Sequence, residues 1–148
     1  MKKNLASNNK ESSAFSFSKN EKAIEQYNKG IDFLKTENYK EALTWFKKAV
    51  KTDPQFAFSW DNFGICSRKL DKLDDALEAY NKSLNIDPRG KTPLQNIPVV
   101  YQFKQEYDKA IEAYNKLLTA YPGDVEGYFG IGRMYILKSD LERFTIHL

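Results

Sequence analysis

The stretch YKEALTWFKKAVKTDP, residues 39–54, decides the fold of this chain because it occurs three times. It returns as LDDALEAYNKSLNIDP at 73–88 and as YDKAIEAYNKLLTAYP at 107–122. Corresponding residues of successive copies stand 34 positions apart. Each copy has an alanine, an aromatic residue four positions later and a proline at its end: Ala42, Phe46 and Pro54; Ala76, Tyr80 and Pro88; Ala110, Tyr114 and Pro122. Self-similarity at a fixed period of this length indicates an array of stacked supersecondary units.

The sequence upstream of each copy follows the same 34-residue frame. Glycines occupy one position of the frame in three units: Gly30, Gly64 and Gly132. Aromatic residues occupy the position three later in the first, third and fourth units: Phe33, Tyr101 and Tyr135. The third unit has Pro98 at the glycine position. From about residue 23 to its end, the chain resembles the tetratricopeptide repeat family, whose unit is a helix, a turn and a second helix. Trp60 and Phe63 with Gly64 come closest to the family pattern of a large residue followed by Leu-Gly.

The resemblance implies an all-α fold, an α-α superhelix. We expect three full helix-turn-helix repeats, about 23–56, 57–90 and 91–124, and a fourth that is cut short at 125–148. The alanines and glycines allow the two helices of a unit to approach closely, and the aromatic residues fill the space between units. Because one helix pair cannot bury both of its apolar faces, neighbouring units stack and share a continuous core.

The helix boundaries can be predicted from caps and breakers. We expect helices at about 19–35, 39–51, 56–69 and 73–85, with Asp-Pro steps ending the first two pairs. Residues 1–18, rich in Ser, Asn and Lys, are predicted to be a disordered tail ahead of the array at 19–148. Ser18 and Glu21 form the pattern of a capping box. Phe17 is then expected to pack locally on the first turn rather than to act as a ligand-mimicking tail.

Two places depart from the repeat pattern. Pro98 lacks the amide that would bond to the carbonyl of Leu94, at a cost of about 3 kcal/mol. We expect its helix to be kinked there or to start late, near residue 97, although Thr92 could cap an earlier start with Pro93 at the first position. In the fourth unit, Asp124 caps a helix predicted to run to about Lys138. Phe144 replaces the alanine of the other units, so 140–148 is expected to be frayed or repacked.

Charge and composition exclude several classes of function. Residues 1–22 carry five lysines and two glutamates, and the remainder has 18 basic and 18 acidic residues. A neutral body without a basic stripe argues against a nucleic-acid partner. No apolar run approaches membrane-spanning length, and no signal peptide is recognisable, so we expect a cytoplasmic location and no membrane partner. The single cysteine, Cys66, is expected to be a buried, inert thiol.

No arrangement of residues points to catalysis. His147 is the only histidine, and no cluster of His, Cys, Asp and Glu has metal-ligand spacing. The sequence has no glycine-rich phosphate loop and no nucleophile elbow. We therefore expect a protein that is not an enzyme and that needs no cofactor and no metal.

What remains is the surface of the first helix of each unit. The row opposite the packed face would line the inner side of a curved stack, and it is rich in apolar and aromatic residues. Asn28, Asn62 and Asn96 repeat beside it with the period of the fold, a ladder that could hold an extended peptide backbone. The predicted groove comprises Tyr27, Asn28, Ile31, Leu34, Asn62, Ile65, Arg68, Asn96, Val99, Phe129 and Arg133. The two arginines would favour an acidic residue or a terminal carboxylate.

Some members of the family grip the C-terminal tail of a chaperone with a set of Lys, Arg and Asn side chains. The corresponding positions here are Tyr27, Ile31, Asn62, Thr92 and Asn96. Only Asn62 matches that set, so the sequence predicts that a chaperone tail is not the partner.

The leading hypothesis is a non-enzymatic interaction module that binds a peptide of another protein in the groove. The alternative is a self-associating element, because Tyr135, Ile136 and Leu141 of the last unit have no full covering helix. We expect that surface, within 125–148, to form a homodimer or a concentration-dependent oligomer. A regulatory part of a larger enzyme is a third, weaker alternative.

Overall fold

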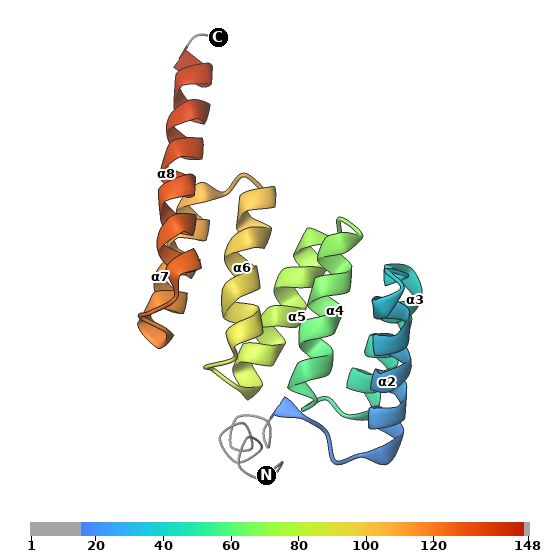
Figure 1. Ribbon diagram of the computed structural model, residues 1–148. Coiled ribbons are helices and arrows are strands. Elements are labelled where there is room, and N and C mark those ends of the chain that lie inside the picture. The colour runs from blue at the N-terminus through green and yellow to red at the C-terminus, as the bar shows by residue number, and fades with distance from the viewer. Residues whose placement is uncertain (1–15, 147–148) are drawn as a thin grey trace. The chain divides into compact units, whose positions relative to one another are not determined.

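The structure is a computed structural model that describes residues 16–146, and every regular element in that range is an α-helix. The helices are α2 (Glu21–Lys35), α3 (Tyr39–Thr52), α4 (Ala57–Lys69), α5 (Leu73–Ile86), α6 (Lys91–Phe103), α7 (Tyr107–Ala120) and α8 (Val125–Ile146). The first four begin and end within two residues of the predicted boundaries. The all-α repeat fold predicted from the 34-residue period is confirmed (Figure 1).

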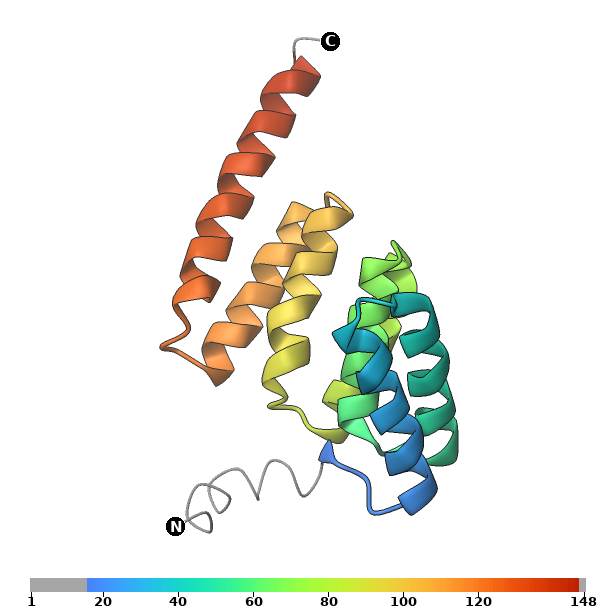
Figure 2. The same cartoon turned by 45° about the vertical axis from the view of Figure 1, so that its right-hand side comes forward.

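The chain divides into two compact units, at Pro93 and Leu94. In the first unit, α2 packs on α3, α3 on α4, and α4 on α5. In the second unit α7 packs on α8, and α6 and α7 run side by side (Figure 2). A tight turn separates the two helices of each full repeat.

The geometry that the repeats share depends on small residues packed against large aromatic rings. Ala42, Ala76 and Ala110 are completely buried, as are Phe46 and Tyr80. A Cβ atom built on Gly30 would lie 2.6 Å from the ring of Phe46, and one built on Gly64 would lie 2.5 Å from the ring of Tyr80. The glycines are therefore required for the close approach of α2 to α3 and of α4 to α5.

The turns inside the three full repeats share a left-handed residue. Glu37, Asp71 and Gln105 have φ of 58°, 61° and 60°. At the first turn the Glu37 amide bonds to the Leu34 carbonyl and the Asn38 amide to the Phe33 carbonyl, the pair of bonds that defines a Schellman motif. The same pair recurs at the other two turns. Because these residues are not glycine, the left-handed conformation in the turns was not evident from the sequence.

The start of α2 differs from the prediction. Its cap is Asn20, whose side-chain oxygen accepts from the Ala23 amide at 3.0 Å, and not Ser18. The hydroxyl of Ser18 instead accepts from the Asn20 amide and donates to Asp53. Ser16 and Ser18 are buried, so the last three residues of the predicted tail pack against the first unit. The other residues of that tail, 1–15, lie outside the described range.

The expectation that α6 starts late is wrong. The helix begins at Lys91, one residue before the predicted cap Thr92, and continues through Pro98 to Phe103. Pro98 is fully buried and Leu94 is nearly so. The ring thus fills a packed position, and the apolar contact offsets the hydrogen bond that proline cannot donate.

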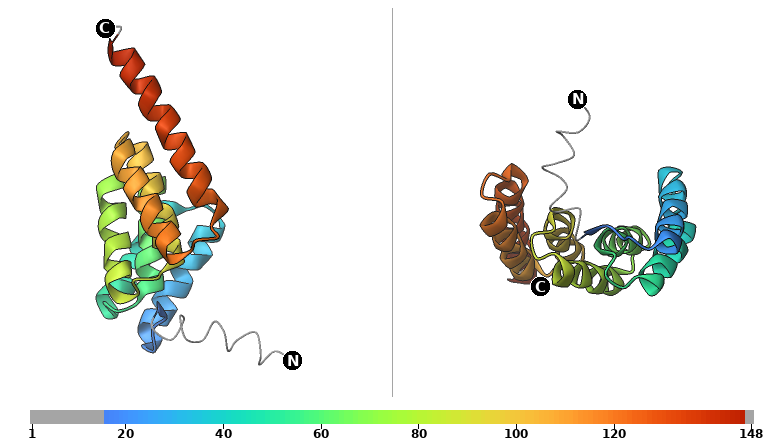
Figure 3. Two further views of the ribbon diagram at one scale, coloured as in Figure 1. Left: turned by 90° about the vertical axis from the view of Figure 1, so that its left-hand side faces the viewer. Right: turned by 90° about the horizontal axis from the view of Figure 1, so that it is seen from below.

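The fourth unit is also different from the prediction, because α8 is one continuous helix of 22 residues with no break after Lys138. It runs back along α7 and continues past the residues where α7 starts (Figure 3). Phe144 lies where the other units bury an alanine, and a ring cannot enter that close contact; its side chain is 66% exposed. Gly132 shares the position of Gly30 but faces no atom within 4 Å, whereas Gly130 approaches the ring of Tyr114. The last residues, His147 and Leu148, lie outside the described range.

Lysine side chains lie over the rings of both tryptophans in the first unit. Lys29 and Lys48 place their ammonium groups 4.6 and 4.2 Å from the ring centroid of Trp45, and Lys82 lies 5.1 Å from that of Trp60. Cys66 is buried as expected, and burial raises the pKa of its thiol to about 12, which keeps it protonated and unreactive. Within residues 16–146, no helix is both long enough and apolar enough to cross a bilayer.

Candidate functional site

A pocket of about 270 Å³ opens in the first unit between α2, α4 and the start of α6. Its lining residues are Tyr27, Phe58, Asp61, Asn62, Ile65 and Thr92. Tyr27, Asn62 and Ile65 belong to the groove predicted from the sequence, and the structure brings them together. They converge because α2 and α4 hold equivalent positions in successive repeats, so residues 34 or 35 positions apart become neighbours.

The other predicted groove residues do not line this pocket. In the first unit, Ile31 and Leu34 pack against the core around Phe46, Asn28 is exposed on α2, and Arg68 is half-buried on α4. In the second unit, Asn96 and Val99 are half-buried on α6, and Phe129 and Arg133 are exposed on α8. The Arg133 guanidinium lies 2.5 Å from a carboxylate oxygen of Glu126, and this contact raises its pKa. Its charge is therefore already matched within the protein.

Three residues that line the pocket were not in the predicted groove: Phe58, Asp61 and Thr92. Asp61 is the one with a charge. It is 6% exposed, and its Oδ1 atom is buried without a hydrogen-bond partner. Burial raises the pKa of this carboxyl to about 7; a hydrogen bond with Ser83 opposes the rise, and the charge of Asp87 adds to it. The signal that could have identified it was a carboxylate between Phe58 and Ile65 in the row of residues expected to line the inner side of the stack.

The side chain of Asn62 is engaged within the protein. Its amide nitrogen donates to the hydroxyl of Tyr27 at 3.3 Å and to the carbonyl oxygen of Phe58 at 3.0 Å. Burial raises the pKa of Tyr27, and this hydrogen bond opposes the rise. At the centre of the predicted asparagine ladder, the amide donors thus orient Tyr27 in the pocket wall.

The second unit contains a separate pocket of about 330 Å³ between the start of α7 and α8. Lys138 and Asp108 form an ion pair at its edge, with 2.8 Å between the ammonium nitrogen and the carboxylate oxygen. Of the residues predicted for self-association, Leu141 lines this pocket, and Tyr135 and Ile136 are 58% and 63% exposed on α8.

The lining residues limit what each pocket can hold. Among residues 16–146, no group of three or more His, Cys, Asp or Glu side chains is placed to hold a metal ion. The pocket of the first unit combines aromatic walls with one buried carboxylate. Such a pocket fits an apolar group that carries a hydrogen-bond donor or a positive charge.

Comparison with known proteins identifies the family. Three family models, each described as tetratricopeptide repeat, match residues 20–56, 59–89 and 100–144. Together these ranges cover more than half of the sequence. The chain belongs to the tetratricopeptide repeat family. No curated protein matches the sequence.

Solved structures with the same fold are numerous. The first TPR of Spaghetti (RPAP3), bound to the HSP90 peptide SRMEEVD, superimposes with a TM-score of 0.76 at 18% identity, covering 84% of this chain and 98% of that one. MamA gives a TM-score of 0.76 at 25% identity over 79% of this chain and 68% of its own. A tetratricopeptide repeat protein from Parabacteroides merdae gives 0.74 at 27% identity, over 81% and 48%.

Proposed function

We propose that this protein is a non-enzymatic interaction module whose first unit binds a peptide segment of another protein in the pocket around Asp61. Support comes from the unpartnered, buried Oδ1 atom of Asp61, which is the single observation that carries the proposal. A buried polar atom without a partner costs on the order of 1–3 kcal/mol, and more when it is charged. A donor supplied by a bound peptide would recover that free energy.

The chemistry of the pocket points to a basic or N–H-rich segment. Tyr27 and Phe58 provide aromatic surface for the aliphatic stem of a lysine or arginine, and Asp61 provides the counter-charge. An acidic tail would place its carboxylates against Asp61, without a lysine or arginine among the residues that line the pocket. We therefore propose that the peptide differs in charge from the HSP90 tail bound by the first TPR of RPAP3.

A random heptapeptide library displayed on phage tests the proposal. Selection on the full chain should enrich peptides with Lys or Arg, and selection on Asp61→Asn should lose that enrichment. Asp75→Asn removes an exposed carboxylate at the start of α5 and should select like the unaltered chain. A synthetic SRMEEVD peptide should not bind. Selection of acidic peptides, or of the same basic peptides by Asp61→Asn, would contradict the proposal.

The affinity of a selected basic peptide should depend on pH in a defined direction. The peptide binds the ionised carboxylate of Asp61, and that form is depleted below a pKa of about 7. Affinity should fall by up to about tenfold for each pH unit below 7, and level off above it.

Asn62→Ala, which frees the hydroxyl of Tyr27, should weaken binding by about 1–3 kcal/mol without unfolding the chain.

Self-association through α8 is a second candidate function, and one observation favours it. Tyr135, Ile136 and Phe144 are each more than half exposed on a helix that extends past α7. Light scattering across a hundredfold range of concentration should report a homodimer that Ile136→Ser weakens. A monomer throughout that range would exclude this candidate and leave the proposal for the first unit intact.

A further inference from the structure

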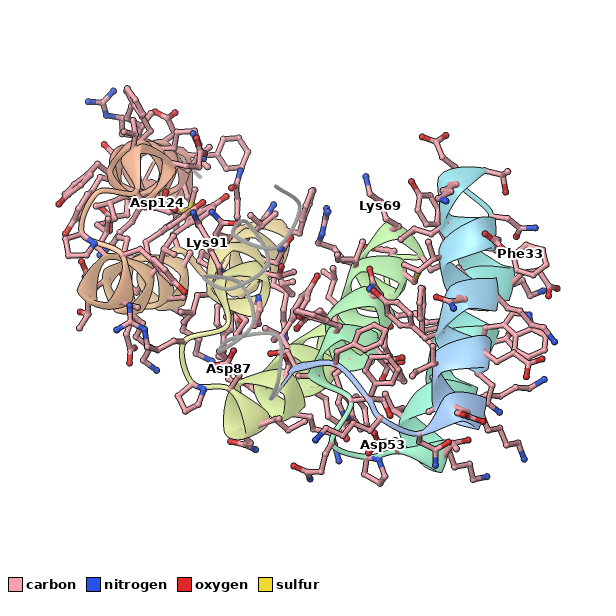
Figure 4. The ribbon with its side chains drawn as sticks, turned by 60° about the horizontal axis from the view of Figure 1, so that its bottom comes forward. Phe33, Asp53, Lys69, Asp87, Lys91 and Asp124 are labelled. Atoms are coloured by element: carbon pink, nitrogen blue, oxygen red, sulfur yellow. The ribbon has the colours of Figure 1, made fainter. Side chains whose placement is uncertain are left out.

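Residues 16–18 precede the first helix of the array, yet contacts in two different repeats hold them in place. The hydroxyl of Ser16 donates to Asp87 Oδ2 at 3.2 Å, and the hydroxyl of Ser18 donates to Asp53 Oδ2. Figure 4 labels both aspartates, and the segment that leads into α2 runs between them. The two acceptors are 34 positions apart, so the period of the fold creates a matched pair of sites for two hydroxyl groups.

Each aspartate is built to present one oxygen to such a hydroxyl. Asp53 Oδ1 accepts from the Gln55 amide and Asp87 Oδ1 from the Arg89 amide, both at 3.1 Å. These bonds fix the carboxylates in the turns that end α3 and α5 and leave Oδ2 of each for the segment. The third repeat has Tyr121 at the equivalent position, so the pair belongs to the first unit alone.

The ring of Phe17 lies on an aromatic surface between the two serines. Its centroid is 5.1 Å from that of Phe56, 5.7 Å from that of Tyr27 and 6.3 Å from that of Phe58. The first two contacts are edge-on, with interplanar angles of 73° and 86°, a favourable geometry for aromatic rings. Phe17 is therefore not the local staple that the sequence predicted. Tyr27 and Phe58 also line the Asp61 pocket, so this aromatic surface adjoins it.

Phe17 packs on this surface but is not part of the core of the repeats. Phe56 is completely buried with Ala23 and Ala49, and Tyr27 and Phe58 pack against that cluster from the repeats themselves. Phe17, by contrast, is 38% exposed and belongs to no helix pair. The core cluster between α2, α3 and α4 does not include Phe17, so we expect residues 16–18 to leave the surface without disrupting it.

We propose that this surface is a second subsite of the peptide groove, which takes an aromatic residue with a hydroxyl-bearing residue on each side, and that Ser16–Ser18 fill it in the free protein. A partner segment with the same three-residue pattern, called here the triad, displaces residues 16–18 and continues into the Asp61 pocket. The inference rests on the proposed function, because it assigns the partner an aromatic anchor beside its basic group.

The test uses the full chain and a synthetic peptide of residues 14–20, AFSFSKN, carrying a fluorescent label. Phe17→Ala vacates the subsite, and this variant should bind the peptide at least about tenfold more tightly than the unaltered chain, which is a 1.4 kcal/mol difference. The matched peptide AFSASKN should not bind. Phe103→Ala, which removes another exposed phenylalanine, should bind AFSFSKN no better than the unaltered chain. Equal affinity of Phe17→Ala and the unaltered chain, or no binding to either, would overturn the inference.

A second measurement needs no variant. Saturating AFSFSKN added to the unaltered chain should speed amide hydrogen exchange in residues 16–20 and leave exchange in α3 and α5 unchanged. Unchanged exchange in residues 16–20 would count against displacement.

The two proposals fail separately. If basic peptides bind in a manner that depends on Asp61 but Phe17→Ala gains nothing, the triad subsite is wrong and the pocket stands. If Phe17→Ala binds AFSFSKN but Asp61→Asn selects the same peptides as the unaltered chain, the assignment of Asp61 is wrong.

Discussion

The same position of the 34-residue frame has opposite surroundings in the two units of the molecule. In the first unit, Gly64 lies against the buried ring of Tyr80, which a helix of its own repeat supplies. In the second unit, Gly132 faces open space, because α8 is not followed by a partner helix within residues 16–146. The packing of a repeat residue therefore depends on which helix lies beside it. Two glycines at the same position of the frame can have different contacts.

The largest expected effect is on the closed side of this comparison. Gly64→Ala would place a methyl group 2.5 Å from the ring of Tyr80, which is completely buried and cannot move away. We expect a loss of about 3 kcal/mol in the free energy of unfolding of the first unit, as for other overpacked cores. Urea unfolding followed by tryptophan emission measures it. A loss below about 1 kcal/mol would show that α4 and α5 can separate freely.

The next effect concerns the buried carboxylate. Asp61 titrates near 3.9 in an unfolded chain and near 7 in the folded one. Between these values the folded state binds more protons, so stability falls as pH rises, and the loss is complete above about pH 7. The groups around it are Ser83, Asp87, Tyr27 and Tyr80.

Asp61→Asn removes this titration. We expect the variant to be more stable than the unaltered chain by about 2 kcal/mol at about pH 8, and by close to nothing at about pH 3. Unfolding curves in urea at the two pH values measure the difference, with Asp75→Asn as the control. A variant that is less stable at the higher pH would mean that the carboxylate is satisfied in the free protein.

In the second unit, Gly132→Ala should stabilise α8, whereas Gly64→Ala destabilises the first unit. The added methyl group meets nothing within 4 Å, and alanine favours a helix over glycine by about 1 kcal/mol. Amide hydrogen exchange in α8 should slow accordingly. Faster exchange would show that this position has a partner in solution, as a homodimer through α8 would provide.

The smallest effect is at a turn. Gln105 has φ of 60°, a conformation that glycine adopts without strain, so Gln105→Gly should stabilise the turn between α6 and α7 by about 0.5 kcal/mol. Lys116→Gly, in the interior of α7, is the matched control and should destabilise by about 1 kcal/mol. Thermal melts by circular dichroism compare the two. Destabilisation by both would imply that the Gln105 side chain makes a contact worth more than the strain.

The sequence predicted what depends on periodicity and missed what depends on single contacts. The four helices of the first unit followed from the recurring Ala, Gly and aromatic positions, because burial selects residue size there. The continuation of α8 was missed because the repeat pattern predicts a turn after about Lys138. The sequence from Tyr135 to Ile146 contains no Pro or Gly to stop a helix, and this local signal was the better guide.

For the candidate site, the frame placed Tyr27, Asn62 and Ile65 correctly next to one another because each is a fixed position of a repeat. The state of Asp61 could not be read from the frame, because it depends on which atoms surround one carboxylate oxygen. The path of Ser16–Ser18 was hidden for the same reason: its acceptors, Asp53 and Asp87, look like ordinary residues before proline in turns.

The two tryptophans that lie against lysines allow the unfolding of one unit to be followed by fluorescence separately from the other. The chain contains two tryptophans, Trp45 and Trp60, and both lie in the first unit. Their emission therefore reports on the environment of that unit alone, while far-ultraviolet circular dichroism reports on every helix. If the two signals change at different denaturant concentrations, the units melt independently. A single unlabelled sample can thus show whether the array behaves as one cooperative body or as two.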